Sequence, residues 1–402
     1  MDPFENPFRP GAGTPPPALV GRDELIDKYS VALRRTLAGR PGKSVMPIGL
    51  RGVGKTVLLN RFHKMAQDEG LTVGFIEAPE SGDFKRLLAT RLRSTLLELD
   101  EGPVSRAVKR ALGTLKSFTY NLPDGGAISL NVDAIAGSAD SGVLAEDTTD
   151  LLVAVGEAAK DRKTGLLLAI DEVQYLAAEE LGALISAIHR TVQLSLPVIL
   201  VGAGLPQLPG LAGNAKSYAE RLFDFPHVGS LDDPDARAVL VLPAEAQGVA
   251  FTDEALDMLL DLAQGYPYFL QEWGYHVWNA SPKSPITLDD VRLAAPDVQR
   301  QLDRNFFLVR MDRLTPAEKH YLSAMAKLGA GPHRSGDIAA QLGVKVESVA
   351  PRRSALIQKG MVYSPAHGDT AFTVPMFDDF LRRSTRPASS ARNRGRASKS
   401  GV

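Results

Sequence analysis

The chain of 402 residues contains no cysteine, which excludes disulfide bonds, thiolate catalysis and sulfur-ligated zinc. Long apolar runs are also missing. Stretches such as Leu166 to Ile170 are far shorter than the roughly 18 residues that a membrane-spanning helix requires. The opening sequence, MDPFENPFRP, has neither the basic start nor the apolar centre of a secretory signal. These absences predict a globular protein of the cytoplasm that does not enter a membrane.

The formal net charge of −1 hides an asymmetry along the chain. Residues 311–402 carry 15 Lys or Arg and 7 Asp or Glu, whereas residues 1–310 carry 31 and 40. This separation predicts that the C-terminal part meets a polyanion. About half of the basic surplus lies in residues 385–402, a Ser-, Arg-, Gly- and Ala-rich tail that is expected to be disordered, and a purely solvated tail is the alternative.

Apolar strands alternate with helical patterns from residue 18 to about 230, which predicts an α/β sandwich with a mainly parallel sheet. Ahead of it, residues 1–17 are rich in Pro and Gly and are expected to form a flexible segment. A hairpin is expected over residues 118–132. Beyond the sandwich, residues 231–310 read as a helical bundle, and residues 311–384 follow the winged-helix order of three helices and then two strands.

The segment GLRGVGKT at residues 49–56 fits the P-loop pattern at every required position, between an expected strand and an expected helix. Its glycines let backbone amides and the helix N-terminus face phosphate oxygens, while Lys55 reaches the β- and γ-phosphates and Thr56 ligates Mg²⁺. The residues predicted to contact ATP in this region are Gly49, Arg51, Gly52, Val53, Gly54, Lys55, Thr56 and Val57.

The apolar run from Leu166 to Ile170 ends in Asp171 and Glu172. A strand buried on both faces presents these carboxylates at the edge where open α/β sheets bind ligands. Asp171 is predicted to hold the Mg²⁺ shell and Glu172 to polarise the attacking water. Taken alone, a strand that ends in two carboxylates is a surface cap about as often as it is a catalytic site. When a P-loop precedes it in the chain, the same strand end predicts an ATPase.

With these two motifs the chain resembles the AAA+ ATPases of the initiator-like kind, which are related to origin-recognition ATPases and to the STAND signalling NTPases. The resemblance covers about residues 16–385. It implies a three-layer αβα ATPase core at 18–230, a helical lid at 231–310 and a winged-helix domain at 311–384. In such proteins an adenine-contacting segment resembles Val20, Gly21 and Arg22 of this chain.

The same resemblance implies an arginine that completes a neighbouring subunit's site in an ATP-dependent homo-oligomer. Arg221 is the candidate, because it follows the fourth core strand, and a plain surface ion pair is an equally open interpretation.

Two departures from the family's pattern bear on turnover. A polar sensor residue is expected after the strand at 198–203, yet the sequence there is Gly202-Ala203-Gly204-Leu205. In the lid, Gly265-Tyr266-Pro267 stands where a replication initiator has an arginine, and it resembles the Gly-x-Pro of STAND proteins, so Pro267 is predicted to lie at the nucleotide. Both departures favour a slow switch over a fast motor.

The third helix of the expected winged helix carries Arg352, Arg353 and Lys359 around an apolar stripe, which is the layout of a major-groove reader. Winged helices also dock proteins, and three functions remain open. One is an ATP-dependent switch associated with duplex DNA. Another is a STAND-like signalling ATPase whose winged helix docks protein. A nucleotide-binding scaffold with negligible turnover is the third, favoured by the missing sensor and opposed by Glu172.

Overall fold

The computed structural model describes residues 1–11, 13–40, 42–80, 82–100, 105–120, 130 and 132–384. The chain divides into two compact units, Met1–Val298 and Gln299–Val402. The predicted basic tail, 385–402, lies outside the described residues. In the part of the chain that is described, every helix is too short or too polar to span a bilayer.

The first unit is built on parallel strands. Strands β2 (Thr72–Glu77), β3 (Leu166–Asp171) and β4 (Val198–Gly202) pair in that order, and β1 (Ser44–Val45) pairs with β5 (Phe223–Asp224). A parallel bridge between Ile48 and Gly204 joins the continuation of β1 to the end of β4. The strand that leads into the P-loop is therefore separated by β4 from the strand that ends in Asp171, and both end at the same edge.

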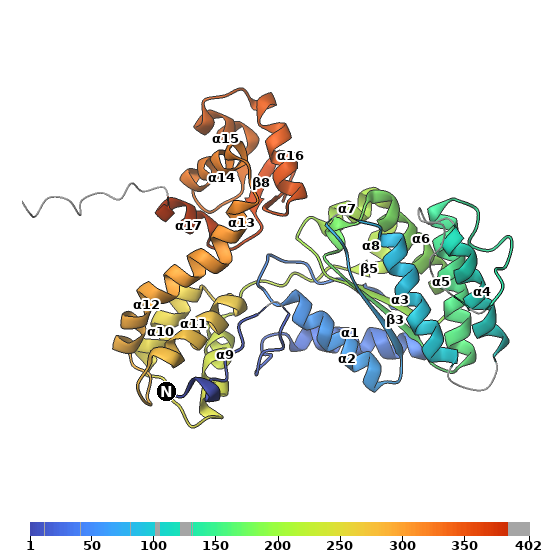
Figure 1. Ribbon diagram of the computed structural model, residues 1–402, viewed down its shortest axis with the longest axis horizontal. Coiled ribbons are helices and arrows are strands. Elements are labelled where there is room, and N and C mark those ends of the chain that lie inside the picture. The colour runs from blue at the N-terminus through green and yellow to red at the C-terminus, as the bar shows by residue number, and fades with distance from the viewer. Residues whose placement is uncertain are drawn as a thin grey trace, which may run out of the picture. The chain divides into compact units, whose positions relative to one another are not determined.

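Helices cover both faces of this sheet because β3 is apolar and buried along its whole length. Leu167 and Ala169 share a core with α1 and α2, while Leu166, Leu168 and Ile170 share a core with α3, α4, α5 and α6. Figure 1 shows these two groups of helices on opposite sides of β3. The core helices are α1 (Asp23–Leu37), α2 (Lys55–Asp68), α3 (Phe84–Asp100), α4 (Arg106–Tyr120), α5 (Leu144–Asp161), α6 (Ala178–Gln193), α7 (Leu208–Ala215) and α8 (Ala219–Leu222).

Helix α4 corrects the sequence-based prediction of a hairpin that starts at Phe118. Val108, Ala111, Leu115 and Phe118 recur at three- and four-residue intervals and are all buried, so this stretch forms one face of a helix. The turn expected at Asp124 lies outside the described residues.

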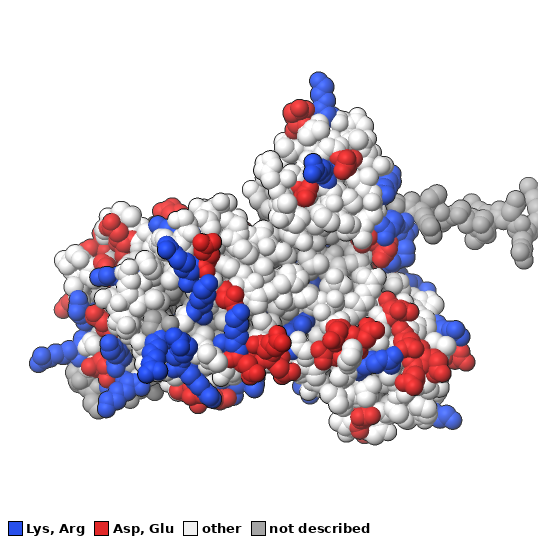
Figure 2. Space-filling model, turned by 180° about the vertical axis from the view of Figure 1, so that it is seen from behind, with Lys and Arg blue, Asp and Glu red and all other residues white. Residues whose placement is uncertain are grey.

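The helical part of the first unit, called the lid below, contains α9 (Asp233–Glu245), α10 (Asp253–Ala263), α11 (Pro267–Ala280) and the start of α12 (Leu288–Leu302). The side chains of Asp232 and Thr252 cap α9 and α10 by accepting backbone N–H bonds. Residues 231–298 hold 12 Asp or Glu against 3 Lys or Arg. Figure 2 shows the acidic side chains gathered on one face of this part, which disfavours contact with a polyanion there.

The N-terminal segment packs on the lid. Phe8 is 2% exposed and lies edge-on to Trp278, with ring centroids 6.4 Å apart. Nearby, the Asn6 side-chain amide donates to the carbonyl of Tyr275 at 2.9 Å, and the Arg9 backbone N–H donates to Gln271 at 2.9 Å. The prediction of a flexible segment overlooked Phe8, whose burial fixes residues around it on α11.

The second unit begins within a continuous helical stretch. Its elements are η3 (a π-helix, Asp303–Leu308), α13 (Val309–Asp312), α14 (Pro316–Leu328), β6 (His333–Arg334), α15 (Ser335–Leu342), η4 (Val346–Ser348), α16 (Ala350–Gln358), β7 (Val362–Tyr363), β8 (Asp369–Phe372) and α17 (Phe377–Ser384). The strands form an antiparallel sheet in the order β6-β8-β7. Thr315 and Glu318 form a reciprocal capping box that begins α14.

Candidate active site

The loop of residues 49–54 leaves the continuation of β1 and enters α2 at Lys55. Gly54 caps that helix with a left-handed φ of 92°, a conformation that strongly favours glycine. The backbone N–H groups at the start of α2 therefore open toward the carboxyl edge of the sheet. Unsatisfied amides at a helix N-terminus suit the binding of phosphate oxygens.

Lys55 is 7% exposed, and its ammonium donates to the carbonyls of Gly49 at 3.0 Å and Leu50 at 2.9 Å. Burial lowers its pKa to about 8, although the charges of Glu172 and Asp171 oppose that effect. No ion pair joins it to a carboxylate in the described ranges. A buried cation held only by carbonyls is suited to an incoming anion.

Asp171 and Thr56 meet although 115 residues separate them: the Thr56 hydroxyl donates to Oδ2 of Asp171 at 2.6 Å. Burial raises the pKa of Asp171, and the hydrogen bond from Thr56 acts in the opposite direction. A hydroxyl and a carboxylate next to a phosphate-binding loop are the protein oxygen ligands of Mg²⁺ in proteins that bind nucleoside triphosphates. The residues present therefore fit a bound Mg-nucleotide.

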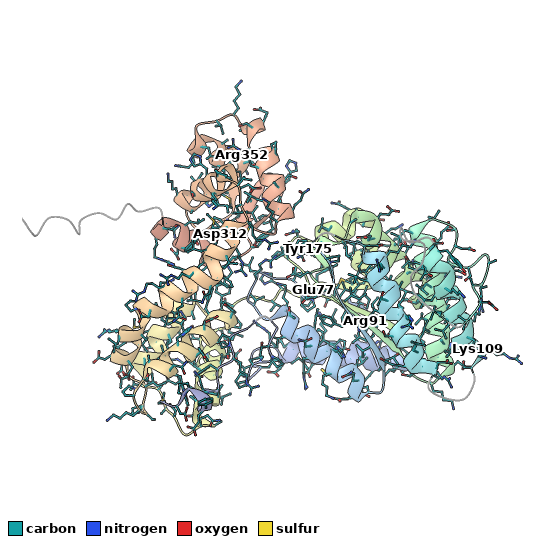
Figure 3. All side chains as sticks on the ribbon, viewed as in Figure 1. Glu77, Arg91, Lys109, Tyr175, Asp312 and Arg352 are labelled. Carbon is teal, nitrogen blue, oxygen red and sulfur yellow. The ribbon has the colours of Figure 1, made fainter. Side chains whose placement is uncertain are left out.

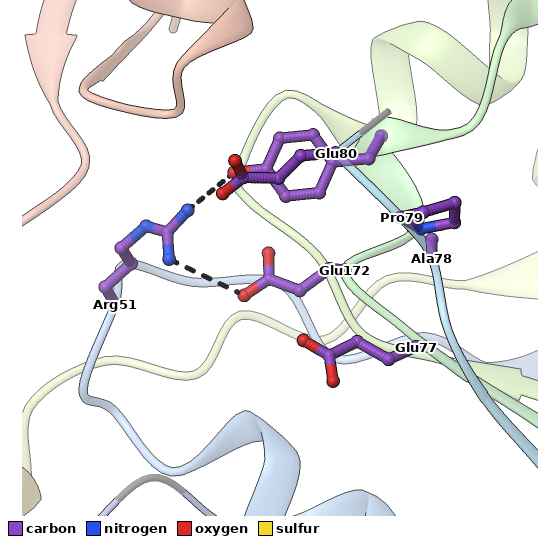
Figure 4. A pocket seen from close by; sticks show the side chains of 7 residues that line it. Arg51, Glu77, Ala78, Pro79, Glu80 and Glu172 are labelled. Carbon is purple, nitrogen blue, oxygen red and sulfur yellow. Dashed lines mark hydrogen bonds and ion pairs between the residues drawn. The ribbon is translucent and has the colours of Figure 1, made fainter. Parts of the chain in front are cut away.

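Glu172 follows Asp171 with a left-handed φ of 54°, which is uncommon for a residue other than glycine and turns its side chain back along the sheet edge. One carboxylate oxygen lies 3.8 Å from Arg51, and the other accepts a hydrogen bond from Gln174. Arg51 also donates to the hydroxyl of Tyr175 at 2.6 Å. The dashed lines of Figure 4 mark the two contacts of Arg51.

These side chains border a cavity of about 310 Å³, whose lining residues are Arg51, Glu77, Ala78, Pro79, Glu80, Glu172 and Tyr175. Figure 3 labels Glu77 and Tyr175 at this carboxyl edge of the sheet. The cavity lies beside the P-loop and is bordered by the carboxylate of Glu172, which is the position that a water-activating group requires.

The lid touches the P-loop through the backbone. Pro267 is the first residue of α11, and the N–H of the next residue, Tyr268, donates to the carbonyl of Gly52 at 3.2 Å. At the base of the lid the N–H of Leu231 donates to the carbonyl of Gly265 at 2.8 Å. The first turn of a helix has free amides, and here a P-loop carbonyl satisfies one of them. The sequence predicts a contact in this region through Pro267. It does not predict the hydrogen bond of Tyr268, because a backbone N–H is present in almost every residue type.

Comparison with known families gives two matches. The AAA ATPase domain matches residues 18–201. A domain of unknown function (DUF8462) matches residues 304–381. No curated protein matches the sequence.

Among solved structures, the Walker-type ATPase PABY2304 of Pyrococcus abyssi is similar over 93% of this chain and 98% of its own, with 15% identity and a TM-score of 0.59. Two others match with lower TM-scores. The ORC1 protein of Aeropyrum pernix in complex with DNA has 17% identity, covers 92% of this chain and 94% of its own, and has a TM-score of 0.46. The RuvB Holliday junction branch migration motor of Thermotoga maritima has 17% identity, covers 87% and 92%, and has a TM-score of 0.43.

The chain has a P-loop NTPase fold of the AAA+ type. In this AAA+ fold the predicted adenine-contacting segment is tied down by Arg22, which donates to the carbonyls of Gly21 at 3.1 Å and Gly229 at 2.7 Å. Burial lowers the pKa of Arg22. The side-chain amide of Asn60 on α2 reaches the carbonyl of Gly13 at 3.3 Å. The segment that leads to residue 20 thus runs beside the P-loop helix, and adenine contact by Val20 stays a prediction.

Arg221 lies on α8 of the AAA+ core and is exposed. It forms no ion pair with another residue that the structure describes, and the surface ion pair stays an open alternative. Its action on a neighbouring subunit stays a prediction.

The three residues predicted to contact DNA differ in the contacts that their side chains make. Arg353 donates to Thr370 at 2.8 Å, to Ser364 at 2.6 Å and to the carbonyl of Asp369 at 2.8 Å. In addition, Lys359 pairs with the buried carboxylate of Glu318 at 2.8 Å.

Arg353 and Lys359 thus contact polar groups of their own unit, at the start of β8 and at the start of α14. Arg352 makes neither kind of contact with the residues that the structure describes; Figure 3 labels it on α16. Contact of all three residues with DNA stays a prediction.

Proposed function

We propose that the protein is an ATP-binding and ATP-hydrolysing switch of the AAA+ type whose lid responds to the nucleotide. The observation that carries the proposal is the set of three groups at the start of α2 and the end of β3: Lys55, which is buried and pairs with no carboxylate that the structure describes, and Thr56, which is hydrogen-bonded to Asp171 at 2.6 Å. The first suits a phosphate, and the other two suit Mg²⁺.

Each group has a distinct task. Lys55 and the amides at the start of α2 bind the β- and γ-phosphates. Mg²⁺, when held by Thr56 and Asp171, neutralises phosphate charge. Glu172 orients and polarises the attacking water from the border of the cavity. Arg221 of a neighbouring subunit would neutralise charge on the γ-phosphoryl group in a homo-oligomer.

Nucleotide would act on the lid through the hydrogen bond between Tyr268 and Gly52. A phosphate accepts from the N–H groups of the P-loop and leaves the Gly52 carbonyl free to accept, so it would act on this contact by changing the conformation of the loop that presents the carbonyl. Because the last helix of the lid, α12, continues into the second unit, movement of the lid is passed on through a helix. We assign the second unit as a winged helix on its order of helices and strands.

Two partners are proposed for that unit. Duplex DNA is supported by the basic surplus of residues 311–402 and by Arg352. Docking to protein, as in a STAND-like signalling ATPase, is supported by the internal contacts of Arg353 and Lys359, which leave fewer cations to meet phosphate or base edges.

Steady-state ATP hydrolysis tests the proposal. Lys55→Ala should abolish binding of a fluorescent ATP analogue, whereas Glu172→Gln should bind it and fail to hydrolyse ATP. Lys64→Ala is the matched control, because Lys64 lies on the same helix, is exposed and pairs with the exposed carboxylate of Asp68 at 2.9 Å. Normal affinity in folded Lys55→Ala protein would reject the nucleotide site, and wild-type turnover in Glu172→Gln would place the catalytic carboxylate elsewhere.

Adding duplex DNA separates the partners. Fluorescence anisotropy at several salt concentrations should show binding that weakens as salt rises if DNA is the partner. Absence of binding at low salt would leave protein docking as the function of the second unit.

A further inference from the structure

The position that lacks a polar residue after β4 is filled by a side chain from another element. Gln174 lies in the 3₁₀ turn η2 (Val173–Tyr175) that follows Glu172. Its carboxamide oxygen accepts the backbone N–H of Leu205 at 3.0 Å, and its nitrogen donates to the Glu172 carboxylate. A single carboxamide therefore links the end of β4 to Glu172.

Gly204 makes room for this arrangement. A Cβ at residue 204 would lie 2.9 Å from the carboxamide oxygen of Gln174 and 3.0 Å from a methyl group of Leu208. Real Cβ atoms essentially never lie closer than 3.0 Å to another atom, so the carboxamide of Gln174 would have to shift. The absence of a side chain at 204 and the place of Gln174 are thus two parts of one arrangement.

We propose that Gln174 is a positioning residue that orients the Glu172 carboxylate for hydrolysis and replaces the missing polar residue after β4. This inference rests on the proposed ATPase function. A general base must stay within hydrogen-bond reach of the water it activates, and a Glu side chain has several torsions with which to leave that place.

The two contacts of Gln174 define the orientation of its amide. Because the Leu205 N–H must meet an acceptor, the oxygen of Gln174 faces β4, and the NH₂ group is left to face Glu172. The other restraint on Glu172 is weaker: Arg51 is 3.8 Å away and already donates to Tyr175. Gln174 is therefore the closer and better-directed of the two.

Two substitutions separate the hydrogen bond from packing. Gln174→Met keeps the volume and removes both polar groups, and it should lower kcat for ATP roughly tenfold or more with KM changed less than about twofold. Gln174→Glu keeps the acceptor for Leu205 and replaces the donor by a second carboxylate next to Glu172. Gln193→Met, on the exposed end of α6, is the matched control and should leave both constants unchanged.

The split between kcat and KM gives a readout that a loss of folding would not produce. Gln174→Glu retains the acceptor for the Leu205 N–H but has no donor for the Glu172 carboxylate, so its kcat should fall roughly tenfold or more, as in Gln174→Met, while KM changes less than about twofold.

Gly204→Ala provides an independent perturbation, because the added methyl displaces the carboxamide without touching its chemistry. It should lower kcat by itself, and it should add little to Gln174→Met, since both changes remove the same contact. Additive losses would show that Gly204 acts through another residue and would count against the proposal.

Failure of the inference is distinguishable from failure of the ATPase assignment. Wild-type hydrolysis, an inactive Glu172→Gln and an unchanged kcat in both Gln174 variants would overturn the role of Gln174 and leave the ATPase standing. Absence of wild-type hydrolysis would overturn both. If Gln174→Met unfolds, Gln174→Glu decides, because it retains the bond to Leu205, and a wild-type kcat in folded Gln174→Glu would reject the proposal.

Discussion

Replacing Lys55 with Met should remove a pH dependence of folding that the burial of this ammonium creates. Burial lowers the pKa of Lys55 to about 8 from an ordinary value of 10.5. Between these values the unfolded chain holds a proton that the folded chain has released, so the free energy of unfolding rises with pH. Below pH 8 both states hold the proton, and the contribution is constant.

For those two pKa values, the free energy of unfolding should rise by about 2 kcal/mol between pH 7.5 and 9.5 because of Lys55. The Met variant lacks this rise, so the difference between wild type and variant isolates it from all other titrating groups. Denaturant unfolding of the nucleotide-free protein, followed by circular dichroism at both pH values, measures the difference. Lys64→Met should behave like wild type, because Lys64 is exposed.

Nucleotide affinity should change in the opposite direction over the same window. Phosphate keeps the Lys55 ammonium charged, so above pH 8 binding must take up a proton, and wild-type affinity for ATP should fall roughly 20-fold from pH 7.5 to 9.5. Titration of a fluorescent ATP analogue measures this. If the difference in the free energy of unfolding between the wild type and Lys55→Met stays constant from pH 7.5 to 9.5, the claim that burial dominates the pKa of Lys55 is refuted.

Thr56→Ala should raise the Mg²⁺ concentration needed for half-maximal hydrolysis about tenfold or more, because it removes one metal ligand, and a Mg²⁺ titration shows this. If Arg221 acts on a neighbouring subunit, specific activity should increase with protein concentration, and mixing Arg221→Ala with Lys55→Ala should restore activity; an inert mixture means that Arg221 is structural. Arg353→Ala should lower the stability of the second unit by about 2–3 kcal/mol, since three hydrogen bonds are lost, and unchanged denaturant unfolding would contradict that. Phe8→Ala should cost about 3 kcal/mol through the cavity left on the lid, visible as earlier thermal unfolding, and an unchanged melting temperature would mean that Phe8 is dispensable.

The elements that the sequence predicts well are those whose pattern decides their structure locally. The buried strand from Leu166 and the helix that follows the P-loop lie where the sequence predicts them, and residues 233–280 form helices as expected for this region. In each, apolar periodicity, a cap or a helix-initiating Pro agrees with the final packing. Thr56 and Asp171 are both predicted to hold the same Mg²⁺ ion, so the sequence also predicts that they lie close together.

The remaining parts depend on contacts between distant segments, which residue types alone do not reveal. Phe8 looks like a lone aromatic in a Pro-rich segment until Trp278 provides its partner. Arg353 looks like a basic residue on an exposed helix face until two of its acceptors appear at the start of β8. The link from Gln174 to Glu172 requires both an unusual φ and a backbone amide from another strand.

Helix α12 has a thermodynamic consequence, because the border between the two units lies at Val298 inside it. A helix end that loses its neighbours exposes unsatisfied amides or carbonyls, and helical order propagates cooperatively from turn to turn. Melting of either unit would therefore fray the helix on which the other depends. The two units share one stretch of hydrogen-bonded backbone, and their unfolding should be coupled, with the proline at 296 and the π-helix at 303–308 as the places where that coupling is weakest.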